Sequence, residues 1–202
     1  MIRSKKHLLL PCAIITFFQR IIILACIPIL SLGGCSKYSD EVQANLTKLK
    51  TTKSCSGCDL SGIELISFDL KNADLSGSNL TGANLSRVDL TEANLTNANL
   101  TDANLVMSIL TSAKLVNTNL SRAKLSYANL SGVDISDSLL VDASMNSSKI
   151  LNSKISDTNM TGTNLHSADL TGTKVSEETL KDAVLCKTIM SSGQQNDSGC
   201  KP

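Results

Sequence analysis

An aliphatic residue or a methionine returns at every fifth position from Leu60 to Leu185, without one slip of register. Most of these residues are leucine, and a small residue such as Ala83 or Ala98 lies two places before most of them. The other three positions of each unit are mostly Ser, Thr, Asn, Asp or Gly. A helix repeats every 3.6 residues and a strand every two, so a period of five fits neither. The period indicates a repeat architecture in which each unit buries its apolar side chain by stacking on its neighbours.

The unit A-[N/D]-L-[S/T]-x, as in ANLSR at residues 83–87, resembles the pentapeptide-repeat proteins. The resemblance covers residues 59–185 and implies an all-β fold, a right-handed quadrilateral β-helix with one pentapeptide per side and four per coil. In that fold the central Leu and the small residue before it point inward. The twenty-six repeat positions then predict about 6.5 coils and a rod on the order of 30 Å long.

Two features of the pattern predict local structure. Phe68 is the one aromatic residue at a small inward position, in the first coil beside Ile63, where we expect a looser end. Several glycines share one outward position, where a corner of the coil is expected to need unusual backbone angles. These glycines are Gly62, Gly77, Gly82, Gly132, Gly162 and Gly172.

The chain divides into four predicted segments. Residues 1–34 are a signal peptide of the lipoprotein type, and residues 35–54 are a lipid-anchored linker and N-terminal cap. The pentapeptide-repeat β-helix spans residues 55–185, and residues 186–202 form a C-terminal cap or tail. Both ends of a β-solenoid need covers, because unpaired backbone groups there would otherwise accept further strands.

The sequence offers material for both covers. Residues 39–53 could form a short helix or another kind of cap. At the other end Glu178 breaks the rule of a small residue before the Leu position. Ser176 followed by acidic residues suits the start of a helix.

The N-terminal segment has the order of a secretory signal peptide. Basic residues begin it, a short apolar run follows at residues 21–32, and small residues precede Cys35. Leu-Gly-Gly-Cys at this place also resembles the bacterial lipobox, which implies that the sulfur of Cys35 is diacylated. Arg20 interrupts the apolar segment, so either the basic region is long or the true start lies downstream of Met1. The alternative is an uncleaved anchor over residues 8–32, in which Arg20 would cost several kcal/mol in hydrocarbon.

Export decides the expected location. The mature protein is predicted to be lipid-anchored to the cell envelope on the periplasmic side, with a multiply acylated Cys35 as a stable anchor. Ser36 in place of an Asp favours the outer membrane over the inner one. Both flanks of the repeats also resemble those of exported pentapeptide-repeat proteins common in cyanobacteria.

Four cysteines remain once the signal and Cys35 are set aside, namely Cys55, Cys58, Cys186 and Cys200. An even number in an exported domain suggests two disulfides, and three pairings are possible. The simplest joins each cysteine to its neighbour in sequence, one bond at each end of the coil. The spacing of Cys55 and Cys58 also invites a thioredoxin-like redox role or half of a zinc site. Both cysteines fall on inward positions of an opening coil, which favours the structural interpretation.

No catalytic, cofactor or metal constellation is present in the sequence, and we expect no enzyme activity. His166 is the one histidine beyond the signal and occupies a surface position. The whole chain carries a formal net charge of +1. Removing the four basic residues before Cys35 leaves a weakly acidic mature chain. That balance does not favour nucleic-acid binding, which usually shows a basic face.

One face of the predicted coil is less polar than the others. Because residues twenty apart would stack, Val106, Met107, Ile109 and Tyr127 gather near its centre. An exposed apolar group rimmed by charge is a candidate protein contact, and drift of the repeat is the competing interpretation. The same face carries Ile66, Arg87, Lys149 and His166.

Three functions follow. The first is a lipid-anchored structural or interaction module of the envelope, with an unknown protein partner and a possible homodimer through an end of the coil. The second is a DNA-mimic inhibitor of type II topoisomerase, as in the quinolone-resistance pentapeptide proteins. That function requires a cytosolic location and a long acidic face, which lysines at positions such as Lys114, Lys124, Lys149 and Lys154 interrupt. The third is a redox protein that works through Cys55 and Cys58.

Overall fold

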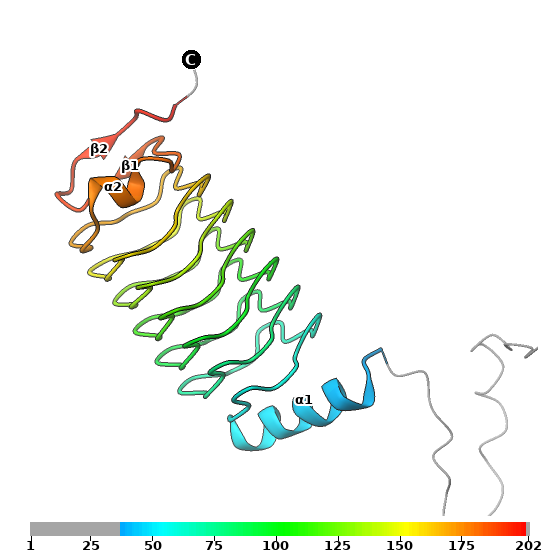
Figure 1. Ribbon diagram of the computed structural model, residues 1–202. Helices are drawn as coiled ribbons and strands as arrows, with labels where there is room; N and C mark the ends of the chain where they lie inside the picture. Colours follow the sequence, from blue (N-terminus) through cyan, green and yellow to red (C-terminus); the bar gives the residue numbers. More distant parts are fainter. Residues whose placement is uncertain (1–36, 201–202) are drawn as a thin grey trace, which may run out of the picture. The chain divides into compact units, whose positions relative to one another are not determined.

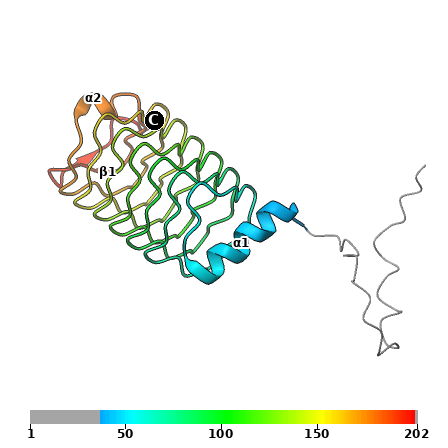
Figure 2. The ribbon, with the colours of Figure 1, turned by 60° about the horizontal axis from the view of Figure 1, so that its bottom comes forward.

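A computed structural model describes residues 37–200 of the chain. A single compact unit begins at Asp40. It holds the helices α1 (Asp40–Thr52) and α2 (Glu177–Leu180) and the short strands β1 (Thr188–Ile189) and β2 (Gln195–Asn196). Between α1 and α2 the backbone winds into a stack of coils, drawn from cyan to orange in Figures 1 and 2. None of the helices within residues 37–200 has the length and apolar character needed to cross a membrane.

The signal peptide, its alternative as an anchor, and the acylated Cys35 lie outside the described residues. They therefore stay predictions.

The coils are joined by parallel bridges between residues that are twenty apart. The first bridge pairs Ser54 with Asp74, and the last pairs Asp169 with Ile189. Because the sequence unit has five residues, a step of twenty gives four sides to each coil. The bridged ladder extends beyond residue 185, where the sequence pattern ends.

Most sides make the same set of backbone hydrogen bonds. On the side at residues 96–100, Asn97 N–H donates to Val116 at 3.0 Å and Leu100 N–H donates to Asn119 at 2.7 Å. Ala98 N–H donates back to Leu95 at 3.0 Å and closes the corner. Asn97, at the third position of that turn, has a φ of +62°, which is the geometry of a type II turn. The six glycines at this position also have positive φ, which confirms the expectation of a special corner.

The interior follows the period of five. The residues at the central position are buried from Leu60 to Leu185, except for the half-buried Val175. Val175 is less covered because the chain leaves the coil directly after it to form α2. Phe68 is half-buried as well, and the ammonium group of Lys50 in α1 lies 5.6 Å from its ring centroid. The first coil is therefore less tightly closed than those that follow.

The outward polar residues belong to a regular hydrogen-bond motif. The Oδ1 atom of Asn79 accepts from the N–H of Thr81 at 3.2 Å and from its hydroxyl at 2.7 Å. The same pair of bonds joins Asp89 to Thr91 and Asn129 to Ser131. An Asx side chain that binds the backbone two residues on is a favoured turn element. This motif explains why Asn or Asp precedes many of the leucines and Ser or Thr often follows them.

Helix α1 covers the N-terminal end of the stack. Its residues Val42, Leu46 and Leu49 are buried. The side-chain amide of Asn45 donates to the carbonyl oxygen of Asp59 at 2.9 Å. The helix thus buries apolar surface and satisfies backbone of the first coil, as the exposed end of a solenoid requires.

The C-terminal end is closed by α2 and by the strands after it. The Ser176 hydroxyl caps α2 by accepting from Thr179 N–H at 3.1 Å, which confirms the expected helix start. Strands β1 and β2 pair antiparallel. The tail then returns to the coil, where an added Cβ at Gly199 would lie only 2.6 Å from the backbone nitrogen of Leu185.

Candidate protein-interaction surface

Four residues form what we call the apolar patch: Val106, Met107, Ile109 and Tyr127. Met107, Ile109 and Tyr127 are 47, 40 and 61 % exposed, and Val106 is half-buried. They come from the sides at residues 106–110 and 126–130, which stack directly on each other because Ile109 is bridged to Asn129. The structure therefore brings the four predicted residues together on one wall of the coil.

Met107 and Tyr127 occupy corners with unfavourable backbone geometry. Their φ angles are +59° and +61°, in the region that glycine and asparagine adopt most readily. The corners lie on consecutive coils, and Met107 N–H donates to the carbonyl of Ser126, the residue before Tyr127, at 3.0 Å. A residue other than glycine in this conformation costs roughly 1 kcal/mol. Corner geometry thus gives no reason for Met or Tyr here.

Ile109 occupies a ladder position where Asn or Asp usually makes the hydrogen bonds to the residue two places on. Its neighbours on the two adjacent coils are Asp89 and Asn129, both of which bind the residue two places on. An isoleucine has no such acceptor, so Thr111 lacks the side-chain partner that Thr91 has in Asp89. The missing bonds cost on the order of 1 kcal/mol each. The patch is therefore unfavourable for local stability at three of its four positions.

Charged groups surround the patch. Arg87 N–H donates to Val106 at 3.0 Å, which places Arg87 on the coil next to Met107. Lys149 is bridged to Asn129 on the opposite edge. Partial burial raises the pKa of Asp89, but hydrogen bonds from Thr91 and the ammonium of Lys71 outweigh it and lower that pKa overall. The rim therefore carries both signs of charge.

The other predicted members of this face lie toward its ends. Ile66 is 52 % exposed, two coils before Val106. His166 is half-buried, and its N–H donates to Asn164 Oδ1 at 3.0 Å. Neither residue is joined to the apolar patch by an uninterrupted run of apolar side chains, because Ser86 and Asn146 stand between.

Leu139 is a second exposed apolar residue, which the sequence reasoning missed. It is 44 % exposed and lies in the ladder between Asn119 and Asn159, on the side opposite the patch. The sequence signals it, because Leu139 interrupts a series of asparagines spaced twenty residues apart. Because both of its ladder neighbours, Asn119 and Asn159, are polar, Leu139 serves as a natural comparison for Ile109.

The cysteines are paired at the two ends of the described coil. Sulfur atoms of Cys55 and Cys58 are 2.06 Å apart, and those of Cys186 and Cys200 are 2.08 Å apart. Cys55 is fully buried and Cys58 is 7 % exposed, so solvent hardly reaches the first bond. No group of three or more potential metal ligands occurs within residues 37–200. The burial of this pair argues for a structural role over a redox role.

Acidic residues do not form a continuous face. Lys114, Lys124, Lys149 and Lys154 all lie on ladder positions of the walls, bridged to residues of neighbouring coils. On one wall the order along the stack is Ser54, Asp74, Asn94, Lys114, Asp134, Lys154 and Lys174. Such an alternation lacks the uniform negative charge that mimicry of DNA requires.

Known proteins share the repeat. The family described as pentapeptide repeats matches in eight copies, over residues 54–91, 69–105, 110–142 and 138–177. No curated protein matches the chain.

Several solved structures are similar. HetL, a pentapeptide repeat protein involved in heterocyst differentiation regulation from the cyanobacterium Nostoc sp. strain PCC 7120, is 23% identical. That match covers 71% of this chain and 87% of HetL, with a TM-score of 0.43. QnrB1, a plasmid-mediated fluoroquinolone resistance protein, is 17% identical over 62% of this chain and 79% of its own, with a TM-score of 0.43. A pentapeptide repeat protein from the Arabidopsis thaliana thylakoid lumen is 24% identical. That match covers 80% of this chain and 90% of the Arabidopsis protein, with a TM-score of 0.34.

Proposed function

Because the chain belongs to the pentapeptide repeat family, we propose that it is a non-enzymatic module of the cell envelope that binds another protein. The family fold is the right-handed quadrilateral β-helix expected from the repeat. Members of this family generally act as structural or interaction modules. Here the rod of about 6.5 coils would present its walls to a partner, and the acylated Cys35 would hold it at the membrane.

The apolar patch carries the proposal. Met107, Ile109 and Tyr127 are exposed side by side where the repeat favours polar residues. An apolar group of this kind with a charged rim is typical of a protein contact. Tyr and Met are also enriched in the centres of protein interfaces. The partner is therefore expected to offer a complementary apolar surface to the walls at residues 106–110 and 126–130.

Membrane attachment rests on the sequence at residues 21–35. The mass of the N-terminal peptide, measured on protein from fractionated membranes, tests it. A diacyl or triacyl mass on Cys35 is the expected result. An unmodified chain that starts at Met1 in the cytosol would overturn the anchor and the export with it.

A pair of matched variants tests the apolar patch. Ile109→Asn places on the patch the residue that the ladder prefers, and Leu139→Asn makes the same change on the opposite wall. With a photo-crosslinker at Tyr127, we expect the full chain in envelope membranes to give a defined crosslinked product. The product should be lost in Ile109→Asn and retained in Leu139→Asn. Equal yields from both variants would show that the patch is repeat drift.

Inhibition of topoisomerase is the alternative that export disfavours. A supercoiling assay with leaderless protein separates the two functions. We expect no inhibition at micromolar protein, because lysines interrupt the ladders of the walls. Strong inhibition would replace the envelope proposal with the DNA-mimic function.

A further inference from the structure

One side of the coil, at residues 156–160, faces α2 instead of another rung. Asn159 is bridged to Leu139 on the preceding coil. No bridge joins Asn159 to Thr179, the residue twenty places on, anywhere in the described ladder. We call this side the open edge. It lies near α2 at the orange end of the stack in Figure 1.

The open edge lacks one complete set of ladder bonds. On the preceding side, Asp137 N–H donates to Ser156 at 2.9 Å, Leu140 N–H donates to Asn159 at 2.8 Å, and Asn159 N–H donates to Ser138 at 3.0 Å. Every side from residues 56–60 to 151–155 makes the same three bonds with the coil that follows it. The corresponding groups of the open edge have no backbone partner within residues 37–200. These groups are the N–H of Asp157, the carbonyl of Thr158 and the N–H of Met160.

The sequence explains the gap. The next rung would be SEETL at residues 176–180, which places Glu178 at the small inward position. A carboxylate cannot be buried there without a partner, and Glu178 instead points outward and binds the ammonium group of Lys181. Thr179 N–H is used by the Ser176 cap at 3.1 Å and is unavailable to Thr158. Leu180 still fills the interior at 3 % exposure, so the core is closed while the edge is open.

A groove lies between the open edge and the segment that carries α2. Its volume is about 830 Å³, within the range of ~300–1,000 Å³ that is usual for binding pockets. One wall is formed by residues 155–161 and the other by residues of the segment 174–182. Asp157, Lys174 and Asp182 line it together with the Glu178–Lys181 pair, so its occupant must be compatible with polar walls.

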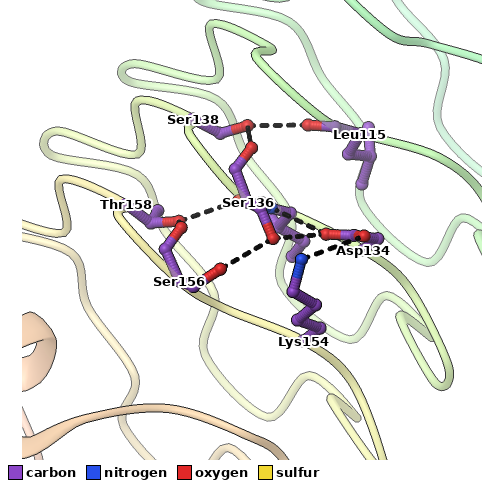
Figure 3. A network of polar contacts seen from close by, with 8 residues as sticks. Leu115, Asp134, Ser136, Ser138, Lys154, Ser156 and Thr158 are labelled. Carbon is purple, nitrogen blue, oxygen red and sulfur yellow. Dashed lines mark hydrogen bonds and ion pairs between the residues drawn. The ribbon is translucent and has the colours of Figure 1, made fainter.

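The open edge is already held in place. Thr158 Oγ1 donates to the carbonyl of Ile135 at 2.8 Å, and Ser156 Oγ donates to Ser136 Oγ at 3.0 Å. Ser136 in turn donates to Asp134, which pairs with Lys154 (Figure 3). An edge fixed by such bonds loses little conformational entropy when a ligand arrives.

We propose that the open edge binds an extended polar segment of another protein by parallel strand addition. The three unpaired groups select a backbone as the ligand. One residue of the segment donates its N–H to the carbonyl of Thr158, and its own carbonyl accepts from the N–H of Met160. The carbonyl of the residue three places earlier accepts from the N–H of Asp157. An extended chain presents this spacing, and main-chain bonds of this kind supply affinity in strand addition. The proposal does not depend on the apolar patch or on membrane attachment.

A peptide with the sequence of one rung is a suitable probe. TNANLT is the sequence of residues 96–101. In the protein, Asn99 N–H donates to Ser78 of the preceding coil and its carbonyl accepts from Leu80, which are the bonds expected of the proposed segment. Amide hydrogen exchange of the full chain measures its binding. Met160 is buried, so the reporter is the amide of the exposed Asp157. We expect this amide to exchange fast in the free protein and about tenfold more slowly with saturating, end-capped TNANLT.

Two N-methylated peptides test whether the backbone is the ligand. Methylation at the residue equivalent to Asn99 removes the N–H meant for Thr158 and should weaken binding about tenfold. Methylation at the residue equivalent to Ala98 is the control, because in the protein that N–H donates to the Leu95 carbonyl of its own coil and makes no bond to a neighbouring coil. Equal affinities of the two peptides, or no slowing of exchange at millimolar TNANLT, would overturn the proposal.

A variant of the protein gives an independent check. Glu178→Thr with Thr179→Asn restores the repeat pattern in the rung after the open edge. The chain should then pair with itself, so the amide of Asp157 becomes protected without peptide and TNANLT no longer binds. Protection of the Asp157 amide in the unaltered free protein would show that a second copy or the chain's own tail covers the edge, and would rule out the proposed partner.

Discussion

Glu178 follows Thr158 by one turn of the coil, yet Thr158 is buried and Glu178 is exposed. The buried hydroxyl of Thr158 has a hydrogen-bond partner, because it donates to the carbonyl of Ile135 at 2.8 Å. A carboxylate in the same slot would carry a charge into the core, where burial without a partner is costly. The regular ladder ends on that side, and the chain forms helix α2 there, capped by Ser176.

The central leucines should dominate stability. Leu100 is fully buried, so Leu100→Ala is expected to lower the free energy of unfolding by about 2–5 kcal/mol. Val175→Ala, at the half-buried central position, should cost about 1 kcal/mol or less. Denaturant unfolding measures both. Equal midpoints for the two variants would contradict the assignment of the interior.

Ile109→Asn should stabilise the fold while it removes the patch. The new Oδ1 can accept from both the N–H and the hydroxyl of Thr111, as Asp89 does from Thr91. We expect a gain of about 1 kcal/mol in the free energy of unfolding. Leu139→Asn should gain less, because Val141 offers an N–H and no hydroxyl. A thermal or denaturant melt that shows Ile109→Asn to be destabilising would contradict the role of the Asx motif.

Gly199→Ala should detach the C-terminal tail from the coil. The added Cβ would lie 2.6 Å from the Leu185 nitrogen, which is backbone and cannot rotate away. Gly193→Ala is the control, since its Cβ meets nothing within 4 Å at a φ of +82°. That change carries only the roughly 1 kcal/mol of a left-handed alanine. Faster exchange of the Ile189 amide in Gly199→Ala is the expected result, and a larger effect in Gly193→Ala would be contrary to it.

Acid should weaken the walls of the coil. Partial burial raises the pKa of Asp134, but hydrogen bonds from Ser136 and the charge of Lys154 outweigh this and lower the pKa overall. A carboxylate with a lowered folded pKa contributes stability that is present above its unfolded pKa of about 3.9 and is lost as the pH falls through the folded value. The pKa values of Asp69, Asp74, Asp89 and Asp102 are lowered too. Unfolding midpoints should therefore fall steeply below about pH 4.

Asp134→Asn tests that acid response. Asparagine keeps the acceptor for Ser136 and has no carboxyl to protonate, so the variant should lose less stability between pH 5 and pH 2 than the unaltered protein. Asp137→Asn removes an exposed corner carboxylate that accepts no hydrogen bond in the described part of the chain. Equal flattening of the pH profile in both variants would contradict the role given to Asp134.

The sequence alone predicts the interior and the corners well. The period of five from Leu60 onward requires one inward position per side, and the glycines at positions such as Gly82 mark the corners that need positive φ. The Asx motif was present in the sequence but had no interpretation until the bonds of Asn79 to Thr81 were seen.

The surfaces are predicted less completely. The apolar patch follows from the twenty-residue stacking, because Val106 and Tyr127 could be placed on one wall. Leu139 was missed, although its phase in the repeat places it at an outward ladder position between Asn119 and Asn159. The open edge could not be foreseen from Glu178, because its groove depends on how far the chain swings out to form α2 and on which ladder bonds are then missing.

The pairing of each outward Asn or Asp with the residue two places on has a consequence for how such a wall changes over time. Thr81 donates to Asn79 within a single coil, and the interior positions of Leu80 and Ala83 are filled independently of that bond. A change of the outward residue leaves the neighbouring coils in register, since Ile109 and Lys114 keep the bridges to the coils on both sides. New binding chemistry can therefore arise on such a wall one side at a time, while the interior side chains stay the same.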